Sequence, residues 1–186
     1  MKKAHLPILI LAIASGCHHT GAIPSSESNA MPPRPAVIPA EGGEKRFLRG
    51  GTAPLLIKVD PASTGSRRMV LGYSDLPPGD AIGIHRHLQE DEIIIITRGT
   101  ARVQLGNRFM TAEAGAAVFI PEGTCIGVTN VGSDTVSNFF VFSSPGFERA
   151  LRAVSTAPGE PPKRLTPQLR QAAFHDAHAV ADPSDC

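Results

Sequence analysis

The chain has 186 residues, a formal net charge of +1, and 41% hydrophobic but only 5% aromatic residues. This length suits one domain with peripheral segments, and the near-neutral charge gives no electrostatic reason to expect nucleic-acid binding. Glycine and proline are abundant, with 18 and 17 residues, as is typical of short strands joined by tight turns. Composition therefore favours an all-β protein.

The first residues have the pattern of a secretory signal peptide, which we place at residues 1–16. Lys2 and Lys3 precede an apolar stretch over residues 6–13, and small residues follow it. Positive charge, a short apolar core and a small-residue ending are the marks of such a signal, and the stretch is short for a membrane span. We therefore expect this segment to direct export and to be removed.

The end of the signal, Ala-Ser-Gly-Cys, resembles the lipobox of bacterial lipoproteins. The resemblance implies cleavage before Cys17 and lipidation of that residue, although Ala14 stands where the family usually has leucine. His18 follows in place of aspartate, which implies sorting to the outer membrane, facing the periplasm. The alternative is an ordinary signal peptide that ends near a cysteine.

Residues 17–43 are rich in proline, serine and glycine and lack apolar periodicity, which predicts a lipidated flexible tether. The next segment, residues 44–154, is the predicted barrel domain. Apart from Cys17, the cysteines are Cys125 and Cys186. A disulfide between them is possible in the oxidising periplasm, although Cys186 ends a polar tail.

From Leu55 to Phe142, short apolar runs alternate with turn residues, and each run predicts a strand. The predicted strands are Leu55–Val59, Arg68–Tyr73, Ala81–His87, Glu92–Thr97, Ala101–Leu105, Arg108–Thr111, Ala117–Ile120, Cys125–Thr129 and Val136–Phe142. Their spacing leaves no room for crossover helices and predicts an antiparallel sandwich or barrel. Glu92–Thr97 is so apolar that we expect both of its faces to be covered.

Two helices are predicted in the C-terminal part of the chain. Phe147–Val154 has apolar residues at helical spacing, and Gln168–Val180 follows a threonine N-cap and a first-turn proline. The last six residues should fray. Residues 155–186 are therefore predicted to form a C-terminal helical segment outside the barrel.

Three side chains form a candidate metal site. Because side chains alternate along a strand, His85 and His87 point the same way and Arg86 points away. A turn then brings Glu92 alongside at the start of the next strand. Two imidazoles and one carboxylate that converge from adjacent strands are a known metal-binding set.

The spacing of these residues identifies the chain as similar to the cupin superfamily, in particular to single-domain type-2 cupins. The five residues of the family's first motif are all present and correctly spaced, and they are Gly79, His85, His87, Glu92 and Gly99. The second motif is represented by Gly115, Pro121, Gly123 and Asn130. Its histidine position is occupied by Ile126. The resemblance implies a single jelly-roll barrel of short antiparallel strands, followed by one or two C-terminal helices.

The resemblance also implies a divalent metal ion, normally held by three histidines and the glutamate. With Ile126 in place of one histidine, the remaining set is His85, His87 and Glu92. This set suits Fe(II), and Mn, Zn or Ni are also reasonable. Glu92 would serve as a ligand or as the proton acceptor in catalysis. The activity implied is that of a quercetinase-like dioxygenase, whereas the alternative is a metal-free envelope protein that binds a small molecule without catalysis.

The predicted pocket wall favours a small apolar or aromatic ligand. Its candidate residues are Ile84, Ile94, Ile96, Phe119, Ile126 and Val128. Ile93 and Ile95 would form an outward apolar strip through which the chain can form a homodimer. The lipid anchor would be its contact with the membrane.

Several other polar residues are predicted to lie at the surface and outside the site. Glu90 and Asp91 are expected in an exposed turn, although Asp91 could replace Glu92 as the carboxylate. His175 and His178 are expected to be solvated on the last helix. Cys125 should point away from the pocket unless a bulge turns its thiolate inward.

Overall fold

The computed structural model describes residues 31–48 and 53–186. Within them lie strands β1 to β11 and helices α1 and α2. The strands are β1 (Glu44–Leu48), β2 (Ala53–Val59), β3 (Val70–Leu76), β4 (Ala81–His87), β5 (Glu92–Arg98), β6 (Thr100–Leu105), β7 (Arg108–Glu113), β8 (Ala117–Ile120), β9 (Ile126–Asn130), β10 (Val136–Phe142) and β11 (Ala179–Ala181). The helices are α1 (Phe147–Val154) and α2 (Pro167–Asp176).

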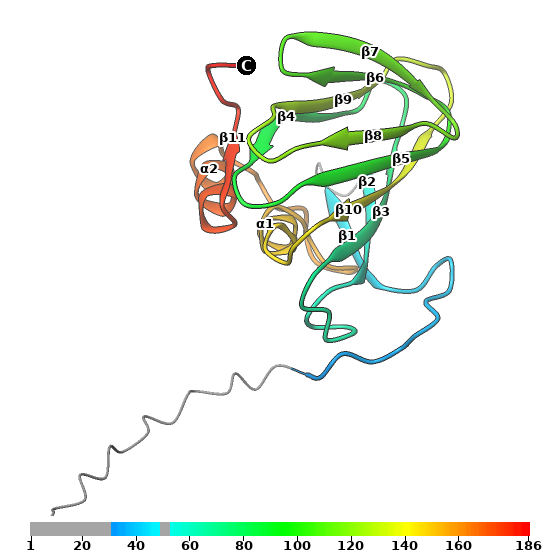
Figure 1. Cartoon of the computed structure of the whole chain (residues 1–186), viewed down its shortest axis with the longest axis vertical. Coiled ribbons are helices and arrows are strands. Elements are labelled where there is room, and N and C mark those ends of the chain that lie inside the picture. The colour runs from blue at the N-terminus through cyan, green and yellow to red at the C-terminus, as the bar shows by residue number, and fades with distance from the viewer. Residues whose placement is uncertain (1–30, 49–52) are drawn as a thin grey trace, which may run out of the picture.

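The strands form two antiparallel sheets that face each other as a jelly-roll (Figure 1). One sheet has the order β1-β2-β3-β10-β5-β8, and the other has the order β11-β4-β9-β6-β7. The two helices pack against each other, and α2 lies beside β11. The predicted all-β barrel with C-terminal helices is confirmed.

Side-chain alternation along the strands places the core between the two sheets. In β5, Glu92, Ile94 and Ile96 are buried, whereas Ile93 and Ile95 are 39% and 37% exposed. The expectation that both faces of this strand are covered is therefore wrong for the single chain. The run of isoleucines reflects one face buried in the core and another that remains open to solvent.

The C-terminal segment differs most from the sequence-based expectation. Helix α2 ends at Asp176 instead of continuing to Val180, because the chain reverses at His178, which has a φ of 55°. The next residues form β11, which pairs antiparallel with β4, the strand of the two histidines. A short alternating segment fits a helix or a strand from sequence alone, and pairing with distant β4 decides between them.

The last residues are tied to the barrel and do not form a frayed end. Cys186 forms a disulfide with Cys125, with their Cα atoms 6.0 Å apart. Arg86, which points outward as predicted, donates to the carboxylate of Asp185 at 2.6 Å. The disulfide turns Cys125 away from the site, so this cysteine is not a candidate ligand.

Helix α1 is fixed to the N-terminal strands by a partly buried ionic cluster. Arg152 of α1 contacts Glu44 of β1 and Asp60, which follows β2 and is fully buried. Burial alone would raise the pKa of Asp60, but hydrogen bonds from Ser63 and Arg152 outweigh it and hold that pKa below its usual value. This cluster joins residues that are about a hundred positions apart in the chain.

The segment before β1 lies against the barrel over the part that the structure describes. The buried Nζ of Lys58 donates to the carbonyls of Pro39, Ala40 and Gly42 at 2.6–2.9 Å. The predicted signal peptide and Cys17 lie outside the described residues. In residues 31–48 and 53–186, neither helix has the length and apolar character needed to cross a bilayer.

Candidate metal centre

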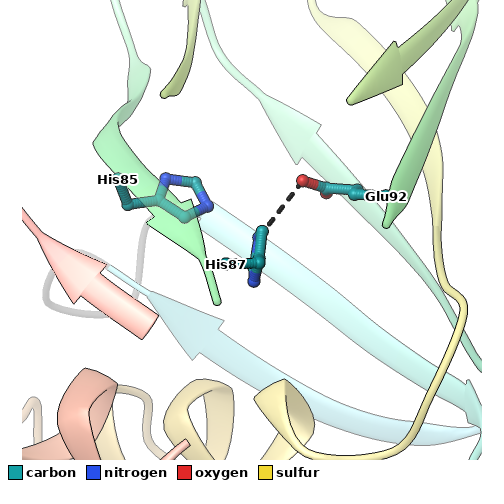
Figure 2. Close-up of side chains that lie close together, drawn as sticks. All are labelled: His85, His87 and Glu92. Carbon is teal, nitrogen blue, oxygen red and sulfur yellow. Dashed lines mark ion pairs between the residues drawn. The ribbon is translucent and has the colours of Figure 1, made fainter. Parts of the chain in front are cut away.

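The predicted ligand residues come together inside the barrel. His85 and His87 project from the end of β4, and Glu92 projects from the start of β5 toward them (Figure 2). All three side chains are buried, and their candidate ligand atoms lie within 4.8 Å of one another. The three residues converge as predicted, but β5 does not lie alongside β4 as expected, because the two strands belong to different sheets that face each other across the barrel.

Two atoms at the centre of this cluster have no hydrogen-bond partner among the described residues. They are Nε2 of His87 and Oε2 of Glu92, which lie 3.3 Å apart without the alignment of a hydrogen bond. When His87 is protonated the two atoms form an ion pair, but neither makes a hydrogen bond, and a ligand that binds both would supply the missing contacts. Imidazole nitrogens and a carboxylate oxygen in such proximity fit a divalent metal ion with ligand bonds of about 2.1 Å.

Both imidazoles are oriented by acceptors on the side away from the cluster. Nδ1 of His85 donates to the Gly83 carbonyl at 2.9 Å, and Nδ1 of His87 lies 3.1 Å from Oε1 of Glu90. Each ring thus keeps Nε2 for a metal ion, as in metal sites where a carboxylate or carbonyl fixes the ring tautomer. The prediction that Glu90 lies in an exposed turn is wrong, since it is only 3% exposed.

The sequence did not identify Glu90 as a functional residue because its partner depends on the loop conformation. The one sequence feature that could have indicated this contact is the spacing of three residues between His87 and Glu90. The loop between β4 and β5 folds back so that Glu90 reaches the outer nitrogen of His87. Asp91, in contrast, accepts from the Glu122 amide at 3.0 Å and stays outside the cluster.

The two histidines titrate in opposite directions in the metal-free protein. Burial, together with the neighbouring charge of His87, lowers the pKa of His85 to about 4. Burial would also lower the pKa of His87, but the carboxylates of Glu90 and Glu92 outweigh it and raise this pKa to about 9. His85 therefore offers a neutral nitrogen at pH 7, whereas His87 must lose a proton when it binds a metal.

Ile126 occupies the position that the family resemblance assigns to the third histidine. It lies directly opposite His85 in the register of β4 and β9, and it is fully buried. Residues opposite each other in an antiparallel pair share a face of the sheet. The side chain of Ile126 therefore points into the barrel beside His85, where it provides an apolar contact and no ligand.

A cavity of about 410 Å³ opens beside His85 and Glu92. Its lining is mainly apolar, and of the six predicted wall residues only Ile94 contributes to it. Phe119 is 59% exposed on the outer face, so its predicted place in the wall is wrong. The aromatic residues of the lining were not predicted from the sequence, and they are Phe140, Phe142, Phe147 and Phe174.

The C-terminal helices bring two of these aromatic rings against the histidines. The Phe147 ring of α1 lies 4.3 Å from the His87 ring and stacks on His85 at 5.6 Å, measured between centroids. The Phe174 ring of α2 meets His85 edge-on at 5.7 Å. These contacts cover the ligand cluster with apolar surface and limit the access of water to it.

The structure is a jelly-roll barrel in which two histidines and one glutamate, from β4 and β5, form a group that could hold a metal ion. Residues 72–142 match the model of the cupin domain family. The chain is therefore similar to cupin domains over this region, which contains all three residues of the cluster. No curated protein matches the chain at a significant level.

Solved structures show the same fold at low sequence identity. A predicted oxalate decarboxylase from Thermotoga maritima is 19% identical, with a TM-score of 0.53 over 59% of this chain and 99% of that one. A cupin-superfamily sugar phosphate isomerase from Silicibacter pomeroyi is 15% identical, with a TM-score of 0.52 over 60% and 77%. KdgF from a Halomonas species is 16% identical, with a TM-score of 0.51 over 59% and 94%. At these identities, the likeness establishes the fold alone.

Proposed function

We propose that this cupin binds one divalent metal ion through His85, His87 and Glu92 and receives a small, mainly apolar molecule in the adjoining cavity. The observation that carries the proposal is the pair of buried atoms, Nε2 of His87 and Oε2 of Glu92, that lack hydrogen-bond partners in the described part of the chain. A bound ion would satisfy both atoms. It would also replace the proton of His87 as the positive charge that compensates the buried carboxylate of Glu92.

The chain's own residues would have separate tasks around the ion. His85, His87 and Glu92 would hold it, and Glu90 would keep the Nε2 atom of His87 directed inward. A bound ion would act as a Lewis acid or as a redox centre, depending on the metal. Two histidines and one carboxylate suit Fe(II), and Mn, Zn and Ni are further candidates.

The reaction that we propose is an oxygenase reaction of the quercetinase-like type. The apolar cavity and its aromatic rings support an apolar or aromatic substrate, and the covered cluster supports chemistry from which water is excluded. In this reaction, Glu92 is the candidate proton acceptor.

A binding module without catalysis is the second candidate, and Ile126 is the observation that favours it. The isoleucine removes one nitrogen ligand from the side of the site that faces His85. If the metal site is weaker or absent, the cavity would still bind its ligand but would not convert it to a product. The proposal of metal binding and the proposal of catalysis therefore require separate tests.

Metal content tests the first claim. Protein purified without a histidine tag should contain close to one equivalent of a transition metal by inductively coupled plasma mass spectrometry, and the His87→Ala variant should contain almost none. His175→Ala is the matched control, because that imidazole is 91% exposed. Equal background levels in wild type and His87→Ala would refute the metal site.

Oxygen uptake separates the enzyme from the binding module. We expect wild type loaded with Fe(II) to consume oxygen with at least one member of a panel of flavonoids and β-diketones, and we expect Glu92→Gln to be inactive. Binding of a panel compound without oxygen consumption, for each of the four metals, would favour the binding module.

We further propose that the protein is exported and anchored by a lipid at Cys17 to the outer membrane, facing the periplasm. The basic residues, apolar stretch and small-residue ending of residues 1–17 support this proposal. Cys17→Ser should move the protein from the membrane fraction to the soluble periplasmic fraction. Unchanged fractionation would contradict the anchor.

A homodimer through the outer face of β5 is also proposed. Ile93 and Ile95 are exposed there, and Phe119 lies opposite Ile93 on the neighbouring strand β8. Replacing Ile93 and Ile95 by serine should shift the sedimentation coefficient to that of a monomer. Phe109→Ser on β7 is the control, since this exposed ring belongs to the other sheet.

A further inference from the structure

Two basic side chains from the C-terminal segment line the mainly apolar cavity. Lys163 precedes α2, Arg170 lies within it, and both contribute to the wall that covers the barrel. Neither belongs to the cupin motifs or to the matched region of the family. Cationic side chains in the wall of an apolar cavity favour a ligand that carries a negative charge.

The guanidinium of Arg170 lies directly against the backbone of β4. A Cβ atom added to Gly83 would lie only 3.0 Å from Nη2 of Arg170, so the space that a side chain would need is taken by the guanidinium. Gly83 is two residues from His85 and also accepts its Nδ1 hydrogen. Arg170 is thus seated at the cavity wall, close to the proposed metal ligands.

Neighbouring groups fix the plane of this guanidinium. The Cζ atom of Arg170 lies 5.1 Å from the centroid of the Phe174 ring. Its Nη1 atom pairs with Asp182, and its Nη2 atom lies 3.4 Å from the Ile84 carbonyl. A guanidinium has five N–H donors, so these two acceptors do not exhaust it. A planar cation held on an aromatic ring with donors to spare is suited to bind a carboxylate.

The ion pair with Asp182 also has a structural interpretation, since it ties α2 to the residue after β11. That interpretation does not account for the absence of a side chain at Gly83, whose space the guanidinium occupies, or for the place of Arg170 in the cavity wall. The Asp182 side chain is 53% exposed, whereas that of Arg170 is 20% exposed. The carboxylate therefore faces solvent more than the guanidinium does, and solvent screening weakens its hold on the guanidinium charge.

Lys163 adds a second positive charge. Its Nζ donates to the carbonyl of Ala153 at 2.7 Å, and no acidic side chain pairs with it among the ion pairs of the described residues. An ammonium group carries three donors, so further acceptors can bind.

Besides the metal cluster and the two basic residues, the wall formed by the described residues holds one charged side chain, Asp75, whose Oδ1 accepts hydrogen bonds from the hydroxyls of Tyr73 and Ser137. Ser74 and Asn138 satisfy each other through hydrogen bonds of 3.0–3.3 Å. The apolar lining includes Leu55, Leu76, Ile82, Ile94, Phe140 and Phe142. The wall therefore combines a large apolar surface with two cationic side chains, Lys163 and Arg170.

We infer that the ligand of this cavity is a small monocarboxylate with an apolar or aromatic body, whose carboxylate is bound by Arg170 and Lys163. The body would lie along the apolar wall toward His85 and Glu92. This inference rests on the proposed function only in placing a ligand in the cavity, and it holds with or without a metal ion. Arg170 and Lys163 are thus assigned as specificity-determining residues.

The test compares 3-phenylpropanoate with its neutral analogue 3-phenylpropanamide. Isothermal titration calorimetry on the full mature chain in detergent at pH 7 should show that the acid binds at least tenfold more tightly than the amide. Arg170→Gln should remove this preference, and Lys163→Gln should reduce it severalfold. Arg164→Gln, which changes an exposed neighbour of Lys163, should leave it intact.

Gly83→Ala provides a second test that keeps the arginine in the chain. The new methyl group should displace the guanidinium from β4 and abolish the preference for the acid, at little cost in folding because the displaced group is the end of a flexible side chain. Gly127→Ala is the matched control, because a Cβ there would have ordinary contacts of 3.7 Å or more.

Equal binding of acid and amide to wild type, or binding of neither at millimolar concentration, would overturn the inference. So would an undiminished preference in folded Gly83→Ala and Arg170→Gln proteins. Metal content measured on the same samples separates this result from the metal proposal. Arg170→Gln should keep its metal, whereas His87→Ala should lose the metal and retain the preference in metal-free protein.

Discussion

The barrel and the C-terminal segment of residues 147–186 build the site by different means. The barrel strands of the cluster, β4 and β5, are consecutive in sequence, and their alternation alone directs His85, His87 and Glu92 inward. The C-terminal segment is placed by contacts with distant residues, among them a disulfide with a sequence separation of 61. Local sequence thus specifies the ligand cluster, whereas long-range contacts specify what covers it.

This difference divides the chemistry of the site between the two regions. The barrel provides the residues that would hold a metal ion, and the C-terminal segment provides the aromatic rings that shield them and the cations that line the cavity. A perturbation of one region should therefore alter metal affinity, while a perturbation of the other should alter enclosure and ligand selection.

Removing the disulfide should loosen the C-terminal segment more than the barrel. For a loop of this length, loss of the cross-link should lower the free energy of unfolding by about 4 kcal/mol. In Cys125→Ser/Cys186→Ser protein, amide hydrogen exchange should rise first in residues 147–186. A uniform rise across the barrel would show that the two regions do not differ in this way.

Asp60→Asn should weaken the attachment of α1 to β1 and β2. It removes a fully buried partner of Arg152, and breaking a buried ion pair costs about 3 kcal/mol of folding free energy. Urea denaturation would measure the loss, with exposed Asp134→Asn as the control. Because the pKa of Asp60 is lowered in the fold, its contribution is present above the unfolded pKa near 3.8 and is lost as pH falls through the folded value.

Glu90→Gln should weaken metal binding without removing a ligand. The amide can still contact His87, but it does not stabilise the ring as the carboxylate does, and changes of this kind reduce metal affinity about 10- to 100-fold. Competition with a fluorescent chelator would measure the affinity. Glu122→Gln, an exposed residue next to the barrel edge, should have no effect. Unchanged affinity in Glu90→Gln would remove Glu90 from the site.

Ile126→His should strengthen metal binding about tenfold by adding a fourth ligand opposite His85. The same competition assay applies, and Val128→His is the control two residues along the strand. A variant that folds but shows no gain would contradict the inward direction of position 126.

In the metal-free protein, the contribution of the two histidines to the free energy of unfolding should be largest near pH 6.5. His85 has a pKa lowered to about 4, so its contribution is present above pH 6.5 and is lost as pH falls toward 4. His87 has a pKa raised to about 9, so its contribution is present below pH 6.5 and is lost as pH rises toward 9. Chelator-treated protein followed by thermal unfolding would show this maximum, and His87→Ala should lose the alkaline decline.

Strand alternation and turn residues sufficed to predict most of the barrel. Three predicted strands, Ala81–His87, Ala117–Ile120 and Val136–Phe142, have the observed bounds, as does the helix Phe147–Val154. These segments have a clear period of two or of about 3.6, which short-range geometry dictates. The same period placed both histidines on one face.

Tertiary contacts decided what local sequence leaves open. Whether Ala179–Ala181 became strand or helix depended on its pairing with β4, and the burial of Glu90 depended on how its loop meets His87. The course of the tail from Ala181 to Cys186 was set by the disulfide with Cys125. Each of these outcomes requires a partner that lies elsewhere in the fold.

By itself, the sequence determined the antiparallel strands and the inward direction of His85, His87 and Glu92, because both follow from side-chain alternation along each strand. The packing of the two sheets against each other brings Glu92 of one sheet to the histidines of the other. Only the tertiary structure decided the shape and lining of the cavity, which depend on how the C-terminal helices dock over the barrel. Arg170 illustrates the distinction. Its place against Gly83 follows from packing between segments 87 residues apart, and no local pattern encodes such a contact.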